Sequence, residues 1–150
     1  MDHEHLLYDL WLPDGEVLKY IEPLRTIVVD AAVRGRATIY HQHWHQFEPW
    51  GVTGFLLLKE SHISVHTWPE EDNFAAVDIF PCGPMDVDLI VRLLREALHP
   101  LRERVLREAR GGGTGLTSHP RPPAAGAPSP LSSPLEGEEG AAGSGERGAE

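Results

Sequence analysis

The chain has 150 residues, with 13 Lys and Arg against 23 Asp and Glu, a formal net charge of −10 and a single cysteine. This balance argues against a nucleic-acid partner, because binding a phosphate backbone requires clustered basic side chains. One cysteine excludes an internal disulfide, no stretch approaches the roughly 20 apolar residues of a membrane span, and the first residues do not resemble a signal peptide. We therefore expect a cytoplasmic protein without a membrane or nucleic-acid partner.

The composition changes near residue 110. From Gly111 onward Gly, Pro, Ser and Glu dominate, and large apolar side chains are almost absent. Burial in such a segment cannot offset the entropy that ordering it would cost. We expect one folded domain over residues 1–110 and a disordered tail over 111–150, with a short partner-binding motif in the tail as the alternative.

The first predicted elements are a strand and a helix. Residues 5–12 are apolar and rich in aromatics and end at a Pro-Asp-Gly turn, which is typical of a strand. A helix is predicted over 23–33, since proline is favoured in the first helical turn and Gly35 fits a helix end. Apolar residues recur in it at helical spacing: Leu24, Ile27, Val28 and Ala31.

Strands and a second helix follow. Strands are predicted over 38–47, 52–58, 62–68 and 74–80. In the third, alternation places His62, Ser64, His66 and Trp68 on one face. Residues 86–99 form an amphipathic pattern, and Pro100 is expected to kink or interrupt this helix before 101–110. Successive strands flanked by helices predict an α+β fold, a two-layer sandwich in which helices cover one face of an antiparallel sheet.

One segment combines residue types that could support self-cleavage. Glu60 directly precedes Ser61, His66 follows five residues later, and Cys82 lies twelve residues beyond Glu70. A serine that cuts its own backbone must attack the preceding carbonyl, and that step needs donors for the oxyanion and a base for the proton.

Four blocks of the sequence, residues 43–47, 51–54, 60–70 and 75–83, resemble the prokaryotic S-adenosylmethionine decarboxylase proenzymes. The resemblance extends over about 100 residues and preserves the order of the blocks. It implies a chain that breaks between Glu60 and Ser61 and converts Ser61 into a covalent pyruvoyl group, the cofactor. That group forms a Schiff base with the substrate amine and acts as an electron sink during decarboxylation.

The resemblance also implies roles for single residues. His66 matches the histidine that assists self-processing, and Cys82 matches the cysteine that protonates the decarboxylated carbon. Thr53 lies where the family often has a serine that supports processing, so the hydroxyl is retained. Phe47 and Glu70 match substrate contacts, by stacking and by hydrogen bonding.

Each of these side chains has a plainer interpretation. His66 and Phe47 could be core residues, and an isolated cysteine such as Cys82 is more often a small buried hydrophobe than a reactive thiol. Three histidines at alternate strand positions, His41, His43 and His45, could surround a zinc ion. Because the family resemblance covers part of this segment without a metal, we expect no metal site.

The residues after Glu70 leave the substrate open among several candidates. After Glu70 the connection is more acidic than in many relatives, and it could suit the sulfonium and amine of S-adenosylmethionine, the end of ornithine or arginine, or no ligand at all. The predicted function is decarboxylation of S-adenosylmethionine for spermidine synthesis. The alternatives are an ornithine or arginine decarboxylase and an uncleaved regulatory homologue. The resemblance further implies a homodimer of processed chains with active sites near the interface, which the exposed face of a one-sided sheet also favours.

Overall fold

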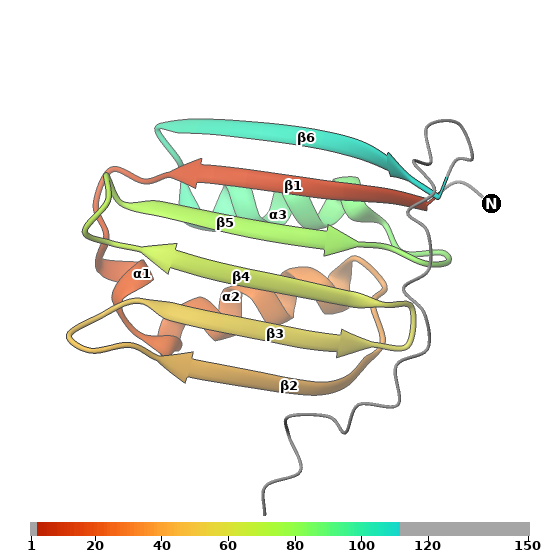
Figure 1. Cartoon of the computed structure of the whole chain (residues 1–150), viewed down its shortest axis with the longest axis horizontal. Coiled ribbons are helices and arrows are strands. Elements are labelled where there is room, and N and C mark those ends of the chain that lie inside the picture. Colours follow the sequence, from red (N-terminus) through yellow and green to blue (C-terminus); the bar gives the residue numbers. More distant parts are fainter. Residues whose placement is uncertain (1–2, 112–150) are drawn as a thin grey trace, which may run out of the picture. The chain divides into compact units, whose positions relative to one another are not determined.

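The computed structural model describes residues 3–111, which form a six-stranded antiparallel sheet covered by helices on one face (Figure 1). The strands are β1 (His3–Trp11), β2 (Ile39–Gln46), β3 (Val52–Leu58), β4 (His62–Trp68), β5 (Phe74–Phe80) and β6 (Arg102–Arg110). They lie side by side in the order β2-β3-β4-β5-β1-β6. The helices are α1 (Glu16–Lys19), α2 (Ile21–Arg34) and α3 (Val87–Leu98). The predicted α+β two-layer sandwich is confirmed.

The sheet has one buried face and one open face because side chains alternate along every strand. In β4, Ile63, Val65 and Thr67 are buried beneath the helices, while His66 and Trp68 belong to the open face. The same alternation in β5 buries its alanine, valine and isoleucine side chains at positions 75, 77 and 79. The open face therefore collects the polar and aromatic side chains, and the predicted faces of both strands are confirmed.

The core lies between the sheet and the helices. Leu24 and Val28 of α2 and Ile90 and Leu94 of α3 are almost fully buried in it. Asp86 caps α3, since its side chain accepts a hydrogen bond from the Leu89 N–H at 3.0 Å. The regular part of α2 begins at the predicted position, because Glu22 just before Pro23 has extended backbone angles.

Residues 101–110 do not continue helix α3. The interruption near Pro100 is confirmed: His99 adopts a left-handed conformation, with φ 48°, and ends α3. The next residues form β6, which pairs antiparallel with all nine residues of β1. Pairing with a distant strand thus decides the conformation of a segment rich in good helix formers.

Within the described part of the chain, no helix is long and apolar enough to cross a membrane. Apart from Gly111, the predicted tail lies outside the described residues.

Candidate active site

The Glu60–Ser61 peptide bond lies in the tight turn between β3 and β4. The Leu58 N–H donates a hydrogen bond to the Ser61 carbonyl at 2.9 Å, so only Lys59 and Glu60 separate the bonded residues. Ser61 is half-buried, and its Oγ lies 3.3 Å from Nδ1 of His62. The turn therefore places a hydroxyl directly after a backbone carbonyl and beside the His62 imidazole.

Cys82 lies at the same end of the sheet as Ser61. Phe80, the last residue of β5, pairs with His62 of β4, and this register carries the chain after β5 toward the β3–β4 turn. A Cβ added to Gly83 would lie 3.7 Å from Cγ of Glu60. The Cys82 residue is exposed and its thiol is free. This end of the sheet thus gathers the proposed cleavage site and the one cysteine.

Thr53 and His66 meet near the other end of the sheet. They are opposite each other in the β3–β4 pair, and the Thr53 hydroxyl is hydrogen bonded to Nδ1 of His66. Burial lowers the pKa of His66 below its ordinary value, and the negative charge of Glu70 opposes that shift. The imidazole is therefore neutral at pH 7 and able to accept a proton.

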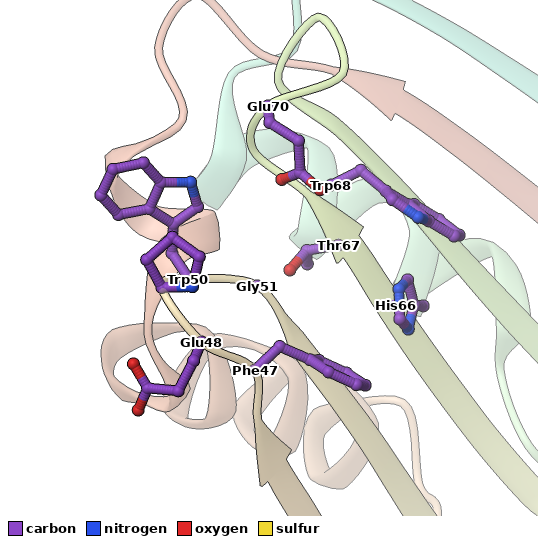
Figure 2. Close-up of a pocket in the computed structure, with 9 residues that line it drawn as sticks. Phe47, Glu48, Trp50, Gly51, His66, Thr67, Trp68 and Glu70 are labelled. Carbon is purple, nitrogen blue, oxygen red and sulfur yellow. The ribbon is translucent and has the colours of Figure 1, made fainter.

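Aromatic rings surround His66 on the open face. The ring centroid of Phe47 lies 5.5 Å from that of His66 in an edge-on arrangement, and the Trp68 ring lies at 4.0 Å. Figure 2 shows the three rings close together, with Phe47 just beyond the end of β2 and His66 and Trp68 on β4. The predicted processing residue and the predicted stacking residue are thus in direct contact.

A cavity of about 530 Å³ opens beside this aromatic group. Its lining includes three of the predicted site residues, Phe47, His66 and Glu70 (Figure 2). The other lining residues are Glu48, Pro49, Trp50, Gly51, Thr67 and Trp68. Trp68 could have been found from its place on the same strand face as His66, whereas nothing in the sequence around Trp50 marks it as a lining residue.

The structure does not bring all predicted site residues together in one chain. Ser61 and His66 are five residues apart along an extended backbone, a separation of roughly 16 Å at the usual rise of a strand. Ser61, Thr53 and Cys82 are not among the residues that line the cavity. One chain therefore presents two half-sites, one around Ser61 and one around His66.

Of the acidic residues in the connection between β4 and β5, only Glu70 lines the cavity. Asp72 points to another partner, since its carboxylate lies 3.5 Å from Arg102 in an exposed ion pair. Glu71 is exposed and closes the turn through its N–H, which donates to the Trp68 carbonyl at 3.1 Å. The extra acidity of this connection is thus directed away from the cavity.

The three alternate histidines lie on the open face of β2, a strand at the edge of the sheet. His41, His43 and His45 are exposed. Across residues 3–111 no group of three or more His, Cys, Asp or Glu side chains is arranged to hold a metal ion.

Comparison with known proteins places this chain in one family. Residues 4–111 match the family described as S-adenosylmethionine decarboxylase. An S-adenosylmethionine decarboxylase proenzyme of Thermosipho africanus is 37% identical over 109 residues, which is 71% of this chain and 82% of that protein. The proenzyme of Thermodesulfovibrio yellowstonii is 47% identical over 79 residues, or 53% of this chain, and the match spans only 58% of its length.

A solved structure has the same fold. The crystal structure of the adenosylmethionine decarboxylase from Aquifex aeolicus superposes with a TM-score of 0.67 and 32% identity, covering 79% of this chain and 97% of the other. The family match over residues 4–111 contains every strand and helix described above except His3, the first residue of β1. The chain therefore belongs to the S-adenosylmethionine decarboxylase family.

Proposed function

We propose that this chain is a proenzyme that cuts its own backbone between Glu60 and Ser61 and then decarboxylates S-adenosylmethionine. The observation that supports this most directly is the place of the Glu60–Ser61 bond in the tight β3–β4 turn of a family member. Neither residue belongs to the paired positions of the two strands, which begin at Leu57 and His62. The bond can therefore distort toward a tetrahedral intermediate without breaking the strand pairing.

The proposed cleavage is an internal acyl transfer followed by an elimination. The Ser61 hydroxyl oxygen bonds to the Glu60 carbonyl carbon, the bond from that carbon to the Ser61 nitrogen breaks, and the hydroxyl proton ends on the nitrogen. A base then removes the Ser61 α-proton, the bond between Cβ and Oγ breaks, and Glu60 leaves as a carboxylate. The remaining dehydroalanine takes up water and releases ammonia, which leaves a pyruvoyl group at residue 61.

A pyruvoyl group fits the position that Ser61 occupies. The amide carbonyl of residue 61 survives the cleavage, and the Leu58 N–H that now binds it at 2.9 Å can hold the new chain end in place. When present, the group supplies an electron sink for loss of carbon dioxide. Cys82, with its free thiol at the same end of the sheet, is proposed to return a proton to the decarboxylated carbon.

The lining of the cavity favours S-adenosylmethionine over ornithine or arginine. Phe47 and Trp68 offer aromatic surface on which an adenine ring can stack, and Glu70 offers a carboxylate to a sulfonium or an amine. Ornithine and arginine have the cationic groups but no aromatic ring to bury here. Thr53 and His66 are proposed to move protons during self-processing, because they are hydrogen bonded to each other.

We also propose that two chains form the working enzyme. The half-sites lie toward opposite ends of β4, and the open face between them exposes Phe55 at 41% and Leu57 at 46%. A second copy packed on this face with its strands reversed would place its His66 region over the Ser61 end of the first. Such a homodimer buries the apolar side chains and completes both sites. Its product would supply aminopropyl groups for spermidine synthesis in the cytoplasm.

Release of carbon dioxide from carboxyl-labelled substrates tests this proposal. The purified chain is incubated in parallel with S-adenosylmethionine, ornithine and arginine, with the Ser61→Ala variant as the matched control. The expected result is release from S-adenosylmethionine alone and none by the variant. Release from ornithine or arginine would change the substrate, and no release by a folded wild-type chain would favour an uncleaved regulatory homologue.

A further inference from the structure

The side chain of Glu60 is bound to a part of the chain outside its own turn. Its Oε2 accepts a hydrogen bond from the Thr38 N–H at 2.9 Å. The preceding residue is held by the same partner, since the Lys59 N–H donates to the Thr38 carbonyl at 2.8 Å. Two adjacent residues of the turn are thus clamped to the amide and the carbonyl of Thr38.

Thr38 can act as an anchor because the residues before it are fixed. At the end of α2 the Gly35 N–H donates to the Ala31 carbonyl at 2.9 Å, and the Ala37 N–H donates to the Ala32 carbonyl at 3.0 Å. Both Ala32 and Ala37 are buried in the core. The helix thereby sets the position of Thr38, and Thr38 sets the position of Glu60.

The two hydrogen bonds to Thr38 hold the Glu60 side of the scissile bond, which the pairing of β3 with β4 does not restrain. The Ser61 carbonyl is held by Leu58 and the next residue by strand pairing, but the electrophile of the proposed cleavage is the carbonyl carbon of Glu60. We propose that Glu60 is a positioning residue for self-cleavage, whose carboxylate holds its own carbonyl in reach of the Ser61 hydroxyl by binding the Thr38 N–H. This inference rests on the proposed self-cleavage.

Two further observations agree with a fixed, ionised carboxylate. The hydrogen bond from Thr38 lowers the pKa of Glu60 below its ordinary value, so the group remains charged at neutral pH and is a strong acceptor. A Cβ built on Gly83, which has a φ of +109°, would lie 3.7 Å from Cγ of Glu60, so the stem of Glu60 lies beside the segment after β5. Glu60 therefore joins the turn to the chain before β2 and to the segment that holds Cys82.

The rate of cleavage in pulse-labelled cell-free synthesis tests the inference. Glu60→Ala removes the acceptor and should slow the break at residue 60 by at least about tenfold, because reacting atoms that drift by about 1 Å lose up to a hundredfold in rate. Glu60→Gln keeps an acceptor oxygen and should cleave within about threefold of wild type. Lys59→Met is the matched control: it alters the neighbouring side chain, keeps the backbone bond to Thr38 and should leave the rate unchanged. Carbon dioxide release per cleaved chain should be equal in all three.

Three outcomes would overturn the positioning role. Glu60→Ala could cleave at the wild-type rate, or Glu60→Gln could be as slow as Glu60→Ala, which would indicate proton transfer by the carboxylate. The third is a collapse of the thermal midpoint when Glu60→Ala is combined with Ser61→Ala, which would assign the slow cleavage to misfolding. A wild-type chain that stays uncut would instead contradict the proposed self-cleavage itself, so the two failures are distinguishable.

Discussion

At the scale of single residues, Thr53 and His66 form the pair that we propose moves protons during self-processing. The strand register puts the two side chains opposite each other, and the hydroxyl is hydrogen bonded to Nδ1 of the imidazole. The bond fixes the orientation of a ring that burial keeps neutral. The threonine hydroxyl makes here a hydrogen bond that a serine hydroxyl could also make.

Substitutions at Thr53 distinguish the effect of its hydroxyl from the effect of its branched shape. Thr53→Val keeps the branched shape and removes the hydrogen bond, so self-cleavage should slow by about ten- to a hundredfold, a range typical of a disturbed acid–base group. Thr53→Ser should cleave within a few-fold of wild type. The fraction of cut chain against time on denaturing gels checks both; equal rates for wild type and Thr53→Val would contradict the role.

The lowered pKa of His66 predicts the pH dependence of cleavage. If neutral His66 is the base, the cleavage rate should be constant near pH 7 and should fall as the pH is lowered. The midpoint of that fall should lie below the ordinary histidine pKa of about 6.5. Glu70 raises this pKa, so Glu70→Gln should move the midpoint to lower pH. A midpoint above 6.5, or a shift upward in Glu70→Gln, would be inconsistent with this environment.

The same shift affects stability with a definite sign. A histidine whose folded pKa is depressed contributes fully above its unfolded pKa of about 6.5, and the contribution is lost as pH falls toward the folded pKa. The thermal midpoint of the uncleavable Ser61→Ala chain should therefore decline in that window.

At the scale of elements, α3 and β6 are tied to β1 by one polar group. The buried Tyr8 hydroxyl donates to Oε2 of Glu103 at 2.5 Å, and Arg95 Nε donates to both oxygens of the same carboxylate, at 2.8 and 2.9 Å. These hydrogen bonds lower the pKa of Glu103, while burial together with Glu103 raises that of Tyr8. A strand, an edge strand and a helix thus share one acceptor.

Removal of the Tyr8 hydroxyl should weaken this connection. Tyr8→Phe leaves the ring in the core and deletes a buried hydrogen bond to a charged group, which should lower the free energy of unfolding by about 1–3 kcal/mol. Urea denaturation of the Ser61→Ala chain measures the difference. Tyr40→Phe is the control, because Tyr40 is 67% exposed. A change no larger than that of the control would show that the hydroxyl contributes nothing.

Local sequence pattern predicted some of these elements and missed others. Strands β3, β4 and β5 were predicted to the residue, because alternation of buried and exposed side chains is a local signal. The strand β6 was not, since its residues are exposed and its conformation depends on β1, almost one hundred residues away. The short helix α1 has too few residues to show a helical period.

The candidate site was predicted in part for the same reason. Resemblance singled out Ser61, His66 and Cys82 as one group, but distance along β4 separates Ser61 from His66 in a single chain. No local sequence pattern indicates which ends of two sheets would face each other in a dimer. Trp50 and Glu48 became visible only through the cavity that they line.

At the scale of the whole molecule, the open face of the sheet is the surface on which we propose that a second chain packs. It bears the exposed Phe55, Leu57 and Leu106, and it separates the Ser61 end from the His66 end. A second copy packed with its strands reversed would place the His66 end of each chain over the Ser61 end of the other. The proposed dimer and the proposed chemistry therefore depend on each other.

Co-expression of two inactive chains tests that dependence. In a mixed dimer of differently tagged Ser61→Ala and His66→Ala chains, Ser61 of the second would face His66 of the first. The His66→Ala chain should then be cut, although it is not cut when expressed alone. If it remains intact in the mixed dimer, His66 does not act across the interface.

The most direct measurement is the intact mass of the denatured protein after incubation at neutral pH. We predict two fragments for wild type, residues 1–60 ending in an ordinary carboxylate and residues 61–150 beginning with a pyruvoyl group, and one uncut chain for Ser61→Ala. A single unbroken wild-type mass, or a break at any other bond, would contradict it.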